Sequence, residues 1–164
     1  MTKFSGVDFY NADGLLTDDE RQVRDLVREW VTAKIVPIIE RHAQEDTFPM
    51  ELVPEMAELG FFGASFTEYG CPGLSHVAHG LLMQELERGD SGLRSFASVQ
   101  TSLVMYPILK FGSEEQKSTW IPRLRTGEAI GCFGLTEPDF GSDPGGMITR
   151  SFHERPYRSR QPVD

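Results

Sequence analysis

The stretch TDDERQVRDLVREWVTAKIVPII, residues 17–39, sets the character of the chain. Its apolar residues recur at spacings of three and four, the period of an amphipathic helix with one buried face: Val23, Leu26, Val27, Trp30, Val31, Ile35, Ile38 and Ile39. Thr17 followed three residues later by Glu20 is a capping-box pattern, so we expect the helix to begin there. Pro37 lies inside the pattern and predicts a kink or a break nearby.

The same period continues along most of the chain. Further helices are predicted over residues 50–59, from Ser75 to about residue 86, over 93–111 with a bend at Pro107, and from Ser113 to just before Gly127. Ser113 and Gln116 repeat the capping-box pattern. These helices predict a mainly α fold.

The pattern changes after Gly127. Residues 129–135 contain two glycines and no helical stripe, which predicts a short strand. Residues 136–146 are rich in turn-forming residues. We therefore expect four parts: an irregular arm (1–16), a helical domain (17–127), the first strand of an incomplete β domain (128–150), and a tail without ordered structure (151–164).

Composition excludes several classes of protein. Of the 164 residues, 39% are apolar and 25% charged, which suits a packed domain. The 25 acidic and 16 basic side chains, a net charge of −9, argue against a nucleic-acid partner. No apolar run is long enough to predict a membrane span.

Two cysteines, Cys71 and Cys132, make neither a disulfide framework nor a metal cluster, and the four histidines show no metal-ligand spacing. Residues 1–10 resemble neither a secretory signal nor a transit peptide. These features predict a cytoplasmic protein, or one of the mitochondrial matrix if the source is eukaryotic.

Two groups of polar residues suggest binding chemistry. The loop 136–146 exposes backbone N–H groups of Gly and Ser, and the hydroxyls of Thr136 and Ser142 add donors for an anionic cofactor. An ordinary surface turn has the same composition. Arg94 lies one helical turn from Ser98, and together they could hold a carboxylate. Alternatively, Arg94 pairs with Glu87 or points into water.

Residues 131–143, GCFGLTEPDFGSD, resemble the Leu-Thr-Glu-Pro…Gly-Ser-Asp signature of the flavin-dependent acyl-CoA dehydrogenases. The resemblance covers about residues 7–150. Upstream segments are most similar to the glutaryl-CoA dehydrogenase branch: Leu86-Glu87-Arg88, Ser91-Gly92-Leu93-Arg94-Ser95, Ser98-Val99-Gln100 and Phe111-Gly112-Ser113-Glu114-Glu115-Gln116.

The resemblance implies an N-terminal helical domain, a middle β domain and a C-terminal four-helix domain, with FAD held between the last two against a neighbouring subunit. It implies that Phe133, Leu135 and Thr136 lie near the flavin ring. Gly141 and Ser142 would lie near the pyrophosphate, and Ser142 would also touch the acyl-CoA.

For the substrate, the resemblance implies that the residue at Arg94, with Ser95 and Ser98, binds the distal carboxylate of glutaryl-CoA, while Glu87 orients the arginine. The reaction would be α,β-dehydrogenation with decarboxylation to crotonyl-CoA. An electron-transfer flavoprotein would accept the electrons from a homotetramer. The family's catalytic base is a glutamate of the C-terminal domain, so no catalytic residue and no metal ligand is assigned here.

After Arg150 the family pattern stops, which we interpret as a shifted reading frame or an early end of a longer gene. Such a fragment is expected to be inactive alone, with residues 129–164 loose and FAD binding weak or absent. Two other interpretations remain: a non-catalytic helical module that associates with full-length subunits, and part of a straight-chain acyl-CoA dehydrogenase.

Overall fold

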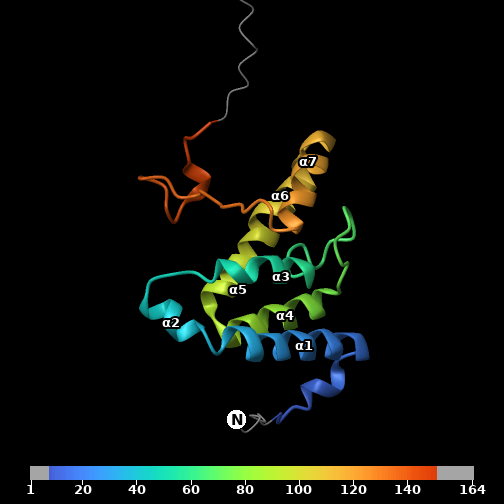
Figure 1. Ribbon diagram of the computed structural model, residues 1–164. Coiled ribbons are helices and arrows are strands. Elements are labelled where there is room, and N and C mark those ends of the chain that lie inside the picture. The colour runs from blue at the N-terminus through green and yellow to red at the C-terminus, as the bar shows by residue number, and fades with distance from the viewer. Residues whose placement is uncertain (1–7, 151–164) are drawn as a thin grey trace, which may run out of the picture. The chain divides into compact units, whose positions relative to one another are not determined.

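The computed structural model describes residues 8–150. The expectations for the tail 151–164 lie outside these residues. One compact unit ends at Phe133 and a second begins at Gly134. The first unit holds all the α-helices of the described chain (Figure 1): α1 (Asp18–Trp30), α2 (Ile39–Gln44), α3 (Val53–Glu58), α4 (His76–Gly89), α5 (Ser91–Ser98), α6 (Tyr106–Phe111) and α7 (Glu114–Arg125).

Helix α1 begins as predicted. The Thr17 hydroxyl accepts a hydrogen bond from the backbone N–H of Glu20 at 3.3 Å, and the Glu20 carboxylate accepts one from the N–H of Thr17 at 2.9 Å. This reciprocal pair satisfies two N–H groups that a helix start otherwise leaves without partners. Ser113 and Gln116 close the same box at the start of α7, so both predicted capping boxes are confirmed.

The break predicted at Pro37 is also present. Helix α1 widens into a π-helical segment, Val31–Ile35, and a turn at residues 36–38 leads into α2. Proline has no N–H to donate and its ring clashes with the carbonyl four residues earlier, so the helix cannot continue through it.

Helices α1 and α4 lie side by side and run in the same direction (Figure 1). Ser75, at the start of α4, bonds Glu20 of α1, and Gly89, at its end, faces the π segment that follows α1. A Cβ on Gly89 would lie 2.7 Å from Val31 Cγ1, so the two elements approach closely because this residue is glycine.

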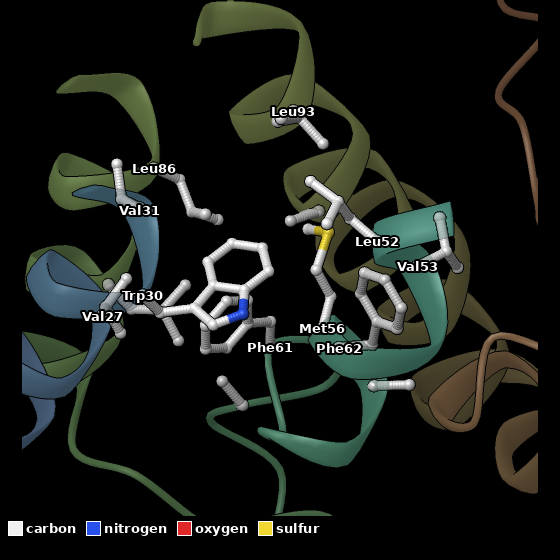
Figure 2. Close-up of a cluster of buried hydrophobic side chains, with 14 of the residues drawn as sticks. Val27, Trp30, Val31, Leu52, Val53, Met56, Phe61, Phe62, Leu86 and Leu93 are labelled. Atoms are coloured by element: carbon white, nitrogen blue, oxygen red, sulfur yellow. The ribbon is translucent and has the colours of Figure 1, made fainter. Parts of the chain in front are cut away.

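The core forms where these helices meet the chain around α3. Trp30 and Phe61 pack edge to face, with ring centroids 5.2 Å apart (Figure 2). Phe61 and Phe62 are fully buried. Leu26, predicted to be buried, is 49% exposed. With about 100° of rotation per residue, Leu26 lies at the edge of the stripe, where no neighbouring element covers it.

Glu85 is the most deeply buried charged residue of the described chain. The Glu85 side chain is 1% exposed and bridges two arginines: its Oε1 accepts from Arg28 Nη2 at 2.6 Å and its Oε2 from Arg88 Nε at 2.8 Å. Burial raises the pKa of Glu85, but the hydrogen bonds and charges of the two arginines outweigh burial, so its pKa lies below the ordinary value. The ion pairs therefore join α1 to α4.

Helices α5 and α6 are joined by a second π-helical segment, Val99–Met105, directly before Pro107. A bend at Pro107 was predicted, whereas a π segment was not. This segment buries two consecutive polar residues, Gln100 and Thr101, each 1% exposed. The Thr101 hydroxyl accepts from the N–H of Gly63 at 3.0 Å, which anchors the loop after α3.

The predicted strand over residues 129–135 is wrong: no strand occurs between residues 8 and 150. A strand needs a partner to satisfy its backbone, and the described chain supplies none. Two of the first three residues of the segment expected to be loose make hydrogen bonds to the helical unit. Ala129 N–H donates to the Arg123 carbonyl at 3.1 Å and Gly131 N–H to Gln100 at 3.0 Å.

None of the described helices is long and apolar enough to span a membrane.

Candidate functional site

Arg94 and Glu87 meet where α4 passes into α5. Asp90 caps α5 by accepting from Leu93 N–H at 2.7 Å, which turns the chain so that the end of α4 faces the first turn of α5. Arg94 Nε then donates to Glu87 Oε2 at 2.6 Å. Ser91 donates to the other oxygen, Glu87 Oε1, also at 2.6 Å. Both oxygens of the Glu87 carboxylate are therefore occupied.

Glu87 occupies only one of the three guanidinium nitrogens of Arg94. Hydrogen bonds from Ser91 and then Arg94 hold the pKa of Glu87 below its ordinary value, so the pair is ionised near neutral pH. Within residues 8–150, Arg94 bonds through Nε alone, and its two terminal nitrogens donate to no protein acceptor. The two terminal nitrogens of a guanidinium can donate two parallel hydrogen bonds to the two oxygens of one carboxylate.

Ser95 and Ser98 follow Arg94 on α5, and both are half-buried. Ser98 lies one turn after Arg94, so the two side chains share a face of the helix. The structure thus brings Glu87 and Arg94 into contact at the α4–α5 junction, while Ser98 lies one turn farther along α5 and Ser95 follows Arg94 on an adjacent face. A hollow of about 800 Å³ farther along the same helical stretch is lined by Ser102, Tyr106 and His79, but not by these four residues.

The predicted cofactor residues straddle the boundary between the two units. Phe133 ends the helical unit and is 49% exposed. In the second unit Leu135 is half-buried, while Thr136, Gly141 and Ser142 are exposed.

The turn from Thr136 to Ser142 is open rather than helical or buried. Glu137 and Phe140 exchange backbone hydrogen bonds at 3.3 and 3.2 Å, which closes the turn. A Cβ built on Gly141 would touch only Thr136 Cγ2, at 3.8 Å, so the two residues are neighbours with space beside them. Within residues 8–150, the N–H groups of Gly141 and Ser142 donate to no protein atom.

The acidic residues of this unit limit its affinity for anions. Glu137 accepts from the N–H groups of Ile148 and Thr149 at 2.9 and 2.8 Å, and the hydrogen bonds from Thr149 and Ile148 lower its pKa. Asp139 and Asp143 are exposed in the same turn. A phosphate group bound there could accept hydrogen bonds from two free N–H groups and two hydroxyls. The nearby carboxylates would repel the same phosphate group.

The family resemblance includes Gln100, as the last residue of Ser98-Val99-Gln100, but implies no role for it. Its Nε2 donates to the carbonyls of Leu124 at 2.9 Å and Ala129 at 2.8 Å, and its Oε1 accepts from Gly131 N–H. In the sequence it is one of several polar residues between Arg94 and Ser102. These residues look alike in the sequence, because only burial separates a polar anchor from a solvent-facing side chain.

Among the described residues, no group of three or more His, Cys, Asp or Glu side chains could hold a metal ion.

Residues 17–128 match the family model described as the N-terminal domain of acyl-CoA dehydrogenase. The chain belongs to the acyl-CoA dehydrogenase family. Among curated proteins of the family, the probable acyl-CoA dehydrogenase YngJ of Bacillus subtilis (strain 168) is 40% identical over 139 residues, which are 83% of this chain and 36% of that protein. The chain thus spans about a third of the length of this relative.

Solved structures of the family have the same fold over most of the chain. A glutaryl-CoA dehydrogenase from Mycobacterium smegmatis in complex with FADH2 is 51% identical, with a TM-score of 0.83 over 85% of this chain and 36% of that one. A glutaryl-coenzyme A dehydrogenase in complex with glutaryl-CoA is 37% identical, with a TM-score of 0.76 over 86% of this chain and 35% of that one.

Proposed function

We propose that this chain forms the N-terminal, substrate-facing part of an FAD-dependent acyl-CoA dehydrogenase whose substrate is glutaryl-CoA. The observation that carries the proposal is the Arg94–Glu87 pair, in which the arginine is oriented through Nε while its terminal nitrogens stay free. The similarity to a solved FADH2 complex and to a solved glutaryl-CoA complex supports the choice of cofactor and substrate.

Arg94 would bind the carboxylate at the far end of the acyl group. Two parallel charge-assisted hydrogen bonds suit a planar carboxylate, and the hydroxyls of Ser95 and Ser98 can donate further ones. Glu87 holds the guanidinium in place, so less side-chain freedom is lost when the substrate binds. An acyl chain without a terminal carboxylate would leave the fork without a partner.

The exposed turn of the second unit fits the anionic linker of FAD. Gly141 and Ser142 offer free N–H groups, and Thr136 and Ser142 offer hydroxyls, while Phe133 and Leu135 would contact the ring system. Ser142 would also touch the acyl-CoA. Bound FAD supplies the redox chemistry, because it accepts the β-hydrogen of the substrate as hydride.

The complete enzyme is proposed to act as a homotetramer and to pass its electrons to an electron-transfer flavoprotein. The base that removes the α-proton is not assigned to any residue of this chain. What these residues contribute is selection and orientation of the substrate.

A chimera tests the substrate assignment. Residues 8–150 would replace the matching part of the Mycobacterium smegmatis glutaryl-CoA dehydrogenase, and turnover of glutaryl-CoA and butyryl-CoA would be compared before and after Arg94→Ala. Loss of a charged, forked hydrogen bond of about 1.5–3 kcal/mol should lower kcat/KM for glutaryl-CoA by roughly 10- to 100-fold. Butyryl-CoA, which has no distal carboxylate, should change little.

Equal losses for the two substrates would contradict the glutaryl-CoA assignment and favour a straight-chain acyl-CoA dehydrogenase. Retention of FAD by the chimera on gel filtration is the control that the site has assembled. If the chimera folds and releases its FAD, the cofactor part of the proposal is wrong.

A further inference from the structure

We propose that Gln100 is a positioning residue that holds the start of the cofactor-facing segment against the helix that carries the substrate-binding residues. The inference rests on the proposed function only for the role of Phe133 toward FAD. The contacts that carry it lie entirely within the helical unit.

Gln100 uses every polar group of its side chain. The two hydrogens of the amide go to the carbonyls of Leu124 and Ala129, and the oxygen accepts from Gly131 N–H, all within 3.0 Å. The side chain is 1% exposed, so water cannot replace these partners. One residue therefore joins the end of α7 to the segment that leads to Phe133.

Gly131 is held from a second side. A Cβ on this residue would lie 2.3 Å from Val104 Cγ1, well inside contact distance, so the backbone rests directly on the π segment. Gln100 and Val104 both belong to that segment. The segment at residues 129–131 is thus fastened by hydrogen bonds and by close packing to one element.

That element continues the helix that carries Arg94, Ser95 and Ser98. Ser98 is the last residue of α5, and Gln100 follows two residues later. The π segment turns the side chain of Gln100 inward while α5 presents Arg94 at the junction with α4. Gln100 therefore fixes the backbone of Gly131, two residues before Phe133, relative to the helix that carries the proposed carboxylate site.

A spin label on Cys132 tests this role without any flavin. Cys132 is exposed and lies between Gly131 and Phe133, and Cys71, the other thiol, would be removed as Cys71→Ser. In the full chain, Gln100→Met keeps the size of the side chain and removes its three hydrogen bonds. We expect the label at Cys132 to move at least about two-fold faster in this variant.

Thr101→Val is the matched control. It changes the residue next to Gln100 and removes the buried hydrogen bond that Gly63 N–H donates to the Thr101 hydroxyl. It should lower thermal stability and leave the label at Cys132 unchanged. A label on Gln22→Cys of α1, in a chain that also carries Cys71→Ser and Cys132→Ser, reports general loosening away from the partners of Gln100 and should respond to neither change. If Gln100→Met and Thr101→Val mobilise Cys132 equally, Gln100 has only a general structural role and the inference is overturned.

A second route tests the inference if Gln100→Met does not fold. Gly131→Ala should mobilise the Cys132 label by displacing the backbone from Val104, and adding Val104→Ala should restore the original mobility. An unchanged label in Gly131→Ala would also overturn the inference. Because neither experiment contains FAD, failure of the cofactor proposal would leave their outcomes unaffected.

Discussion

Glu85 illustrates how single residues decide stability in this protein. A carboxylate buried to 1% exposure is costly unless its charge is matched, and here Arg28 and Arg88 match it from α1 and α4. Arg28 and Arg88 keep 44% and 40% of their side chains exposed, which lowers the cost of burying the cluster. The ion pairs therefore join the two helices and also make the junction dependent on pH.

We predict that Glu85→Gln destabilises the helical unit and removes part of its sensitivity to acid. Because the two arginines stay partly exposed, losing the carboxylate charge costs on the order of 2 kcal/mol, the value of a hydrogen bond to a charged group. The folded pKa of Glu85 is depressed, so its contribution is present above the unfolded pKa of about 4.3 and is lost as pH falls through the folded pKa.

Urea denaturation between pH 7 and pH 3 measures this effect. The original chain should lose more stability over that range than Glu85→Gln does. Parallel curves for the two proteins would show that other carboxylates account for the acid sensitivity.

At the scale of the element, the residues at each helix end determine where the helix begins and stops. Thr17 and Ser113 each close a capping box, and Gly60 and Gly127 adopt positive φ values of 75° and 72° just past the ends of α3 and α7. These signals involve neighbours within three or four residues, so they operate whatever the rest of the chain does.

We predict that Thr17→Ala costs about 1 kcal/mol, because Glu20 N–H at the start of α1 loses its acceptor. For a unit of this size, the midpoint of thermal unfolding should fall by about 3–5 °C. Thr119→Ala on the exposed face of α7 is the control, and it should be neutral or slightly stabilising because Ala is the better helix former. Similar losses in both variants would mean that the cap contributes nothing specific.

At the scale of the whole molecule, most of the proposed flavin-binding residues lie in the small second unit and are exposed. Four of them lie in the second unit, and three of those four are exposed. A tight ligand site buries some 70–90% of its ligand, which an open turn cannot do.

We therefore predict that this chain alone binds FAD weakly. On gel filtration after incubation with excess FAD, flavin absorbance should separate from the protein peak. The chimera described above is the positive control, since it should retain FAD. A stoichiometric yellow protein peak from the chain alone would contradict the prediction.

Much of the helical architecture, and the pairing of Arg94 with Glu87, was predictable from the sequence. Apolar spacing, the two capping boxes and the break at Pro37 depend on short-range backbone geometry, which residues close together in the sequence define. The motif around Gly141 and Ser142 indicated the family through its resemblance to a known signature. Placement of Arg94 beside Glu87 followed from the resemblance, and the structure adds that the contact runs through Nε.

What the tertiary structure alone decided depends on residues far apart in the sequence. Leu26 fits the apolar stripe, yet no neighbour covers it; Glu85 looks like a surface acid, yet two arginines allow its burial. Gln100 is an anchor only because α7 and residues 129–131 bring their backbone groups to it. The segment predicted as a strand stays irregular because a strand is stabilised by a partner. Burial and pairing are properties of the packed chain, and a local pattern cannot contain them.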